Sequence, residues 1–161
     1  MSRISAISVA CHESMMLIRV KGLGSMNNSN GFYRFISEGH KKDFTDVCIN
    51  LEDCDGMDST FMGTLLLIHE ETTNHDGNMV LINVSDYNRS KLDELGVGQF
   101  LDIGKKLEVP PELEYAPLPS EDDNNERMAL VLRAHEELIK KNTDNEKKFG
   151  VFINSLKSSF K

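Results

Sequence analysis

Apolar residues recur at every second position over residues 7–11 and again over residues 16–20. The polar residues 12–14 between these segments are typical of a short turn, so the pattern predicts a β-hairpin. Residues 22–31 are polar and contain glycines, and we interpret them as a loop. The apolar positions of residues 32–36 then have helical spacing, which predicts a short helix after that loop.

Two later segments, residues 46–51 and 79–84, are apolar at nearly every position. Such runs are expected of strands that are covered on both faces. The first run leads into a polar loop, residues 52–56, and then into residues 58–60, whose side chains favour the N-cap of a helix. The apolar run 61–68 that follows predicts a buried helix.

The second buried strand is followed by two further predicted elements. Ser85 and Asp86 are suited to cap a helix that carries Leu92 and Leu95, and residues 100–103 are predicted to form one more short strand. The resulting order, β-α-β-α-β, favours an α/β fold with a partly parallel sheet and right-handed crossovers. Together with the antiparallel hairpin, this predicts a mixed β-sheet with helices packed on one side.

The pattern changes near residue 109, and we therefore predict a main domain over residues 1–108. All four prolines lie within residues 110–119, which predicts a stiff, extended connection over residues 109–119. Residues 120–161 are predicted to form two amphipathic helices. Their apolar stripes comprise Met128, Val131, Leu132, His135, Leu138 and Ile139 in the first helix and Phe149, Phe152, Ile153, Leu156 and Phe160 in the second. Since neither helix can hide its stripe alone, we expect the two to pair, to cover an apolar patch of the main domain, to dock a partner or to mediate self-association.

The charge of the chain argues against a nucleic-acid partner. Eighteen Lys and Arg residues stand against 26 Asp and Glu residues, so the formal net charge of −8 would repel a phosphate backbone. No apolar run is long enough to cross a bilayer, and the alternating first ten residues are unlike a secretion signal, so we expect a cytoplasmic protein without membrane insertion. The three cysteines form no CxxC pair, which favours reduced, mostly buried thiols over disulfides or a zinc site.

No catalytic or metal-binding pattern stands out. His69 and Glu70 are followed by His75, but a zinc-binding helix needs its second histidine four positions after the first, on the same face. We therefore expect no metal, no cofactor and no enzyme activity. The residues alone leave two interpretations of Asp58, Ser59 and Thr60 open: helix capping, or a hydroxyl group displayed at a helix N-terminus.

Residues 47–65, VCINLEDCDGMDSTFMGTL, resemble the signature of STAS domains, the anti-sigma factor antagonists of bacteria. The family pattern is a hydrophobic strand, a loop, Asp-Ser-Ser or Asp-Ser-Thr, and a helix with a glycine in its first turns. Residues 78–84 and 92–103 resemble the next strand, the third helix and the closing segment, so the resemblance extends over about residues 3–104. Phe61 departs from the pattern because it replaces a usual glycine, and residues 22–25 lack a common acidic residue.

The resemblance implies a phosphorylation site and a partner. In the family, the serine directly after the aspartate accepts phosphate from a kinase that is itself an anti-sigma factor, which implies Ser59 here, with Thr60 as the second choice. The implied protein is a partner-switching regulator of transcription that binds this serine kinase while Ser59 is unphosphorylated and is reset by a serine phosphatase. The implied partner-binding residues are Asp55, Gly56, Met57, Asp58, Ser59, Thr60 and Met62.

Two other functions remain open at this stage. The chain could be a STAS subunit of a transporter that is never phosphorylated, which predicts copurification with a transport ATPase. It could also be an enzyme accessory or small-ligand binder, which predicts a ligand-dependent thermal shift.

Overall fold

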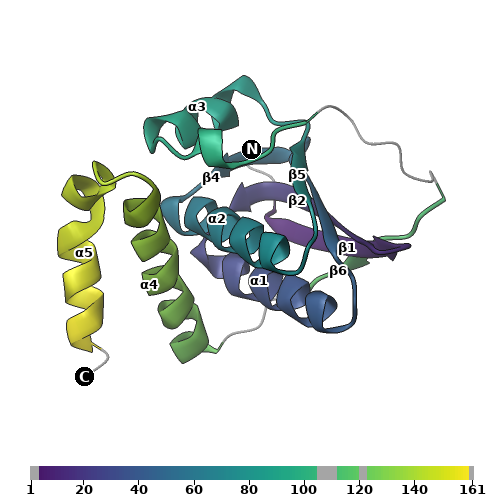
Figure 1. Ribbon diagram of the computed structural model, residues 1–161, viewed down its shortest axis with the longest axis horizontal. Helices are drawn as coiled ribbons and strands as arrows, with labels where there is room; N and C mark the ends of the chain where they lie inside the picture. Colours follow the sequence, from purple (N-terminus) through teal and green to yellow (C-terminus); the bar gives the residue numbers. More distant parts are fainter. Residues whose placement is uncertain (1–3, 105–111, 120–122, 160–161) are drawn as a thin grey trace.

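A computed structural model describes residues 4–104, 112–119 and 123–159 of the chain (Figure 1). In it, a mixed β-sheet has the strand order β5-β3-β2-β1-β6, and β4 pairs with the end of β2. Strands β1 and β2 form the predicted antiparallel hairpin, and β2, β3 and β5 are parallel neighbours. The strands are β1 (Ala6–His12), β2 (Met15–Gly24), β3 (Asp46–Asn50), β4 (Cys54–Met57), β5 (Met79–Ile82) and β6 (Ala116–Pro117).

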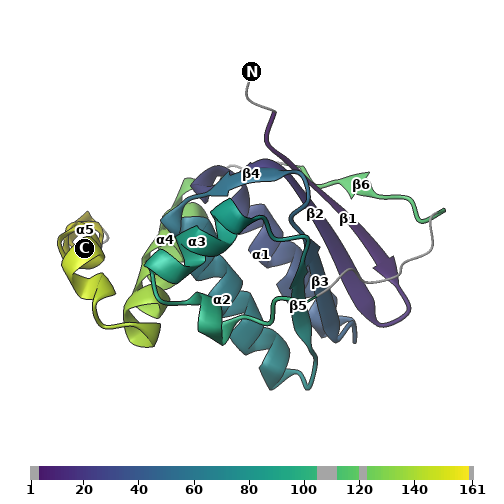
Figure 2. The ribbon, with the colours of Figure 1, turned by 90° about the horizontal axis from the view of Figure 1, so that it is seen from above.

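The helices lie in layers on one side of this sheet (Figure 2). The helices α1 and α2 pack against the sheet, α4 packs against both of them, and α5 is outermost, against α4. This arrangement confirms the predicted α/β fold class and the two C-terminal helices. The helices are α1 (Met26–Lys41), α2 (Ser59–Asn74), α3 (Asp86–Glu94), the 3-10 helix η1 (Gly98–Phe100), α4 (Asn124–Lys141) and α5 (Asn145–Ser159).

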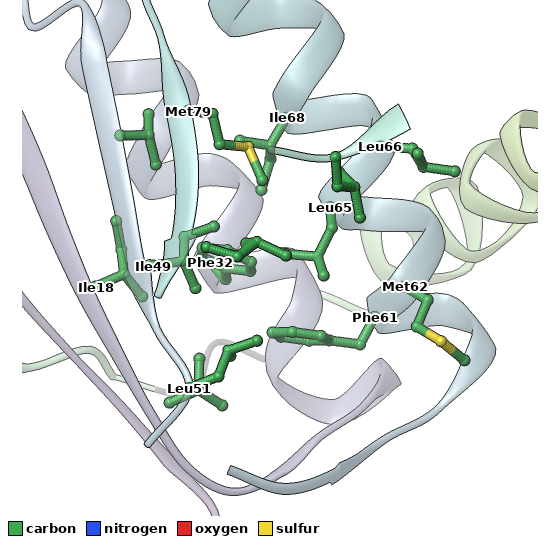
Figure 3. Close-up of a cluster of buried hydrophobic side chains, with 14 of the residues drawn as sticks. Ile18, Phe32, Ile49, Leu51, Phe61, Met62, Leu65, Leu66, Ile68 and Met79 are labelled. Carbon is green, nitrogen blue, oxygen red and sulfur yellow. The ribbon is translucent and has the colours of Figure 1, made fainter. Parts of the chain in front are cut away.

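The main core lies between the sheet and the first helix layer (Figure 3). Phe61 at the start of α2 stacks on Phe32 of α1, with ring centroids 5.3 Å apart. A side chain on Gly24 would collide with the Phe61 ring, since a Cβ atom there would lie 2.7 Å from it. The large residue at position 61 therefore fits because the strand end opposite it has no side chain.

The predicted loop over residues 22–31 is wrong. Strand β2 continues to Gly24, and α1 begins at Met26. The Ser25 side chain accepts a hydrogen bond from the Asn27 amide, and the Asn28 side chain accepts one from the Ser25 amide. This capping of the first turn allows a run of polar residues to start a helix.

Two predictions around the parallel strands also need correction. Residues 52–56 are not simply a loop, because Cys54 to Met57 form the strand β4 beside the end of β2. Residues 100–103 do not form a regular strand: Phe100 ends η1, and Ile103 makes a single parallel bridge with Leu81 of β5.

The proline-rich connection contributes to the sheet where it is described. Ala116 and Pro117 pair with Val9 and Ser8 of β1, which makes β6 an edge strand. Upstream of this strand, Leu113 and Tyr115 pack on a small apolar cluster on the other face of the sheet, formed by Ala10, Leu17, Cys48 and Ile82. Pro110 and Pro111 lie outside the described residues.

The C-terminal hairpin, which we define as α4 and α5 (residues 124–159), is attached to the main domain at the start of α4 and at the turn between the two helices. Near the start of α4, Glu126 forms an ion pair with Arg34 of α1. At the turn between the helices, Asn142 and Asn145 donate hydrogen bonds to the carbonyl oxygen of Leu95, just after α3. The apolar side of α4 therefore meets the main domain in one defined position.

Candidate functional site

Asp58 joins the starts of two helices. It is the N-cap of α2, where its Oδ1 accepts a hydrogen bond from the Phe61 amide at 2.9 Å. Its Oδ2 accepts another from the Met26 amide at the start of α1, also at 2.9 Å. Because one carboxylate satisfies backbone donors from both helices, the edge of the domain around Asp58 is held rigidly.

Ser59 is the first residue of α2, and its hydroxyl group meets the C-terminal hairpin. Its Oγ lies 2.8 Å from Nε2 of His135, a residue of α4 that is 76 positions away in the sequence. The Ser59 side chain is half-buried, and His135 is only 2% exposed. The predicted phosphorylation site is therefore covered by α4, the first helix of the chain's own C-terminal hairpin.

The hydrogen bonds of His135 define its tautomer. Nδ1 lies 2.7 Å from the carbonyl oxygen of Val131, which can only accept, so Nδ1 carries the proton. In the neutral ring Nε2 is then an acceptor, and the Ser59 hydroxyl donates its proton to it. Ser59 thus presents its oxygen to a neutral imidazole and not to a cation.

The surroundings of His135 favour this neutral form. The rings of Phe149 and Phe152 from α5 each meet the imidazole edge-on, with centroids 4.9 Å away. Burial lowers the pKa of His135, while the bond to the Val131 carbonyl and the charge of Asp58 act weakly in the opposite direction. The Ser59 hydroxyl therefore lies under an uncharged, largely apolar cover.

The other predicted site residues lie on both sides of Ser59. Thr60 is 4% exposed, and its carbonyl oxygen accepts a hydrogen bond from the Thr64 hydroxyl. Met62 is buried on the side of α2 that faces away from Phe61 and the sheet (Figure 3). Asp55, Gly56 and Met57 are in β4, so the predicted set forms one continuous stretch from β4 into the first turns of α2.

Two exposed apolar side chains flank this stretch. A Cβ atom on Gly56 would lie 3.2 Å from the Leu23 side chain and 3.9 Å from the Tyr87 ring. Leu23 is 51% exposed and Tyr87 is 57% exposed. This Leu23–Tyr87 patch remains open on the surface next to Asp55, while the hairpin covers the Ser59 side.

Helices α2 and α4 approach each other closely at Gly63. A Cβ atom on Gly63 would lie 2.3 Å from the carbonyl oxygen of Ala134 and 2.8 Å from the Ala134 Cβ. The glycine at this position therefore allows the two backbones to pack almost in contact. Ala134 directly precedes His135, so the same contact places the imidazole over Ser59.

Sequence reasoning missed the functional position of His135. It was assigned to the apolar stripe of its helix, where the structure does place it among apolar groups. A histidine within such a stripe signals a buried polar contact, but the sequence contains no feature that identifies Ser59 as the partner. Gly63 carried a clearer signal, because it is the small residue in an otherwise bulky apolar run.

Within the described residues, no group of three or more metal-ligating side chains comes together. Likewise, none of the helices described is long and apolar enough to cross a membrane.

Comparison with known proteins gives a family match. Residues 6–109 match the model of the STAS domain family. No curated protein gives a significant match to the chain.

Several solved structures share the fold. The anti-sigma factor antagonist SpoIIAA in its unphosphorylated form is 22% identical, with a TM-score of 0.57, and the match covers 64% of this chain and 90% of SpoIIAA. The phosphorylated form of the Bacillus SpoIIAA is also 22% identical, with a TM-score of 0.54 and coverage of 64% and 93%. The crystal structure of the Thermotoga maritima protein TM1081 is 13% identical, with a TM-score of 0.55 and coverage of 62% and 85%. At these identities the comparisons establish the fold.

Proposed function

Because this chain belongs to the STAS domain family, we propose that it is a non-enzymatic, phosphorylation-regulated anti-sigma factor antagonist. In this proposal it binds a serine kinase that is also an anti-sigma factor while Ser59 is unphosphorylated. The observation that carries the proposal is the position of Ser59 at the first residue of α2, directly after its N-cap Asp58. The similar fold of SpoIIAA, solved in unphosphorylated and phosphorylated forms, supports it.

The proposed modification is a phosphoryl transfer from ATP held by the partner kinase. The Ser59 Oγ forms a bond to the γ-phosphorus, the bond between that phosphorus and the β,γ-bridging oxygen breaks, and ADP leaves. The hydroxyl proton passes to a base of the kinase. A phosphatase reverses the step by hydrolysis, which releases inorganic phosphate and restores the hydroxyl group. A location in the cytoplasm, where ATP is available, is part of the same proposal.

The phosphate is expected to affect binding more than the folding of the main domain. It adds about −1.5 to −2 charges, which the backbone N–H groups at the start of a helix accommodate well. In a complex the same phosphate would lose its water beside Asp58 and close to Asp55, in a chain of net charge −8. Phosphorylation would therefore weaken the interface and release the partner.

The proposed docking surface includes the Leu23–Tyr87 patch. This patch offers exposed apolar area on the β4 side of the site, and apolar contacts surrounded by polar groups are usual at protein interfaces. A kinase seated there would lie close to the start of α2.

The proposal is tested by affinity capture with the full-length chain from the cells that produce it. We expect the captured protein to be a serine kinase that phosphorylates Ser59 with ATP, located by mass spectrometry of the phosphopeptide. The phosphorylated chain should then lose the kinase, and Ser59→Ala should retain it without accepting phosphate. Phosphate on neither Ser59 nor Thr60, or equally tight binding of the phosphorylated chain, would refute the proposal.

One observation favours a second candidate, a STAS subunit of a transporter that is never phosphorylated. The Ser59 hydroxyl donates a hydrogen bond to the buried His135, and such a contact gives the serine a structural role that needs no phosphate. This candidate predicts that the captured partner is a membrane-transport ATPase, and that Ser59→Ala and Ser59→Glu copurify with it equally well.

A further inference from the structure

The hairpin and an external partner would use the same surface of α2. Helix α4 lies along α2 on the side away from the sheet, and His135 closes over Ser59 at 2.8 Å. Nearby, Met62, Leu66 and Leu138 belong to one buried apolar cluster that joins α4 to the main core. A kinase that reaches the Ser59 oxygen must therefore take the space that α4 occupies.

We propose that the C-terminal hairpin is an intramolecular competitor that covers the Ser59 surface and must move away before a partner can bind there. The inference rests on the proposed function only for the identity of the partner. The covering contact itself belongs to this chain, because the hairpin follows the segment that matches the family model, residues 6–109.

Because the contact between Ser59 and His135 is short, the hairpin cannot stay packed on α2 while Ser59 carries a phosphate. A hydroxyl oxygen 2.8 Å from Nε2 leaves no room for a phosphorus atom and three more oxygens between Ser59 and His135. The His135 ring and α4 cannot easily shift sideways to make room, because Phe149 and Phe152 pack against the imidazole and the Gly63–Ala134 contact is already tight. A phosphate on Ser59 would consequently displace α4 and keep the hairpin open.

Electrostatic repulsion also opposes a phosphate on Ser59 while the hairpin is closed. The tautomer that satisfies Val131 presents a lone pair of Nε2, and not a proton, toward Ser59. A phosphate oxygen facing that lone pair would be repelled unless the ring gained a second proton. Burial among aromatic rings opposes uptake of that proton, whereas the phosphate itself would favour it. A closed hairpin with a charged His135 is therefore one of the outcomes that the experiment distinguishes.

Hydrogen exchange of the full chain, followed by mass spectrometry, tests the proposal without any partner. In Ser59→Glu we expect the amides of residues 124–159 to exchange at least about tenfold faster than in the wild type. Ser59→Ala, which removes only one hydrogen bond, should stay close to the wild type. A matched control is Ser90→Glu, which adds the same charge at an exposed position of α3. Protection of strands β2 and β3 in every variant shows that the main domain remains folded.

A second pair of variants opens the hairpin without changing Ser59. Ala134 is fully buried against Gly63, whereas Ala129 is exposed on the same helix. Ala134→Glu should accelerate exchange over residues 124–159 in the same way as Ser59→Glu, and Ala129→Glu should not. If Ser59→Glu leaves the hairpin protected, or protects it further through a charged His135, while Ala134→Glu opens it, the proposed competition is wrong.

The two proposals fail separately. A hairpin that stays closed in Ser59→Glu overturns the competition and leaves phosphorylation of Ser59 to be judged by the capture experiment. A hairpin that opens, together with a captured partner that never phosphorylates Ser59, supports the competition and overturns the kinase assignment.

Discussion

At the residue scale, His135 is where the fold and the proposed switch meet. Its ring is buried, neutral and bonded to both the Val131 carbonyl and the Ser59 hydroxyl. A buried imidazole of this kind couples the packing of α4 to a protonation equilibrium. Asp58 is the charged group that contributes at His135, and the rings facing it from α5 carry no charge.

The first prediction concerns the pH dependence of stability. Since burial lowers the pKa of His135, the unfolded chain takes up a proton more readily than the folded chain, and stability falls as the pH drops below about 6.5. His135→Gln should lose about 1 kcal/mol at pH 7.5 through its altered hydrogen bonds. It should also lose less additional stability than the wild type on going to pH 5.5.

Urea unfolding of both proteins at the two pH values measures this difference. The other titrating groups are common to both proteins. The difference in how the free energy of unfolding changes with pH therefore isolates His135. Parallel pH profiles for the wild type and His135→Gln would show that the imidazole is not held neutral by the fold.

The second prediction concerns a carboxyl group in the same interface. Burial and the neighbouring Glu70 raise the pKa of Glu137, while Lys140 and Lys141 act against this shift. An acid whose pKa is raised by folding favours the folded state at low pH, and this advantage disappears as the pH rises through the folded pKa. Glu137→Gln should therefore stabilise the chain at pH 7.5, by about 0.5–1 kcal/mol, and the gain should shrink as the pH falls toward 4.5.

Thermal unfolding across this pH range checks the sign. Glu136→Gln is the matched control, because Glu136 is the adjacent carboxyl group and its side chain is 48% exposed. The explanation fails if Glu137→Gln is less stable than the wild type at pH 7.5, since the ion pair with Lys141 would then outweigh the burial of the charge.

At the element scale, the sequence predicted the strands and helices that have a strong apolar period and missed those that do not. The parallel strands around residues 46–51 and 79–84 and the buried helix after Ser59 were predictable because their neighbours bury most of their apolar side chains. The first turn of α1 is polar and stable through its cap at Ser25, so hydrophobic spacing could not reveal it. Strands β4 and β6 are short and form only by pairing with β2 and β1, respectively. A local sequence pattern does not specify such pairing.

The third prediction tests the contact between α2 and α4. Gly63→Ala would raise helix propensity, but its methyl group would meet the Ala134 backbone, and overpacking of this kind typically costs about 1–3 kcal/mol. We expect lower thermal stability and faster hydrogen exchange in α4.

Gly150→Ala in α5 is the matched control for this prediction. Its new methyl group would only reach ordinary contact with Glu146, at 3.4 Å, so the helix should gain up to about 1 kcal/mol. Equal or greater stability of Gly63→Ala would mean that α4 can shift at little cost.

At the scale of the whole molecule, the family domain and the added hairpin form one packed unit. The apolar stripes of residues 120–161 predicted that the tail must be covered, and the structure places α4 on α1 and α2. Which surface it would cover could not be predicted, because the contact between Ser59 and His135 joins residues 76 positions apart. That placement decides whether Ser59 is an open or a covered site.

The fourth prediction is that the hairpin controls how much Ser59 is phosphorylated in the cell. With the proposed kinase and phosphatase unchanged, a chain whose hairpin cannot close should expose Ser59 for longer. Ala134→Glu should therefore carry a larger phosphorylated fraction than Ala129→Glu, which keeps the hairpin closed.

The most direct measurement is the phosphorylated fraction of Ser59, determined by mass spectrometry on full-length chains recovered from the cells that produce the protein. The account predicts phosphate on Ser59 in the wild type, a clearly higher fraction in Ala134→Glu, a wild-type fraction in Ala129→Glu and none at this position in Ser59→Ala. Ser59 free of phosphate in the wild type and in Ala134→Glu alike would contradict it.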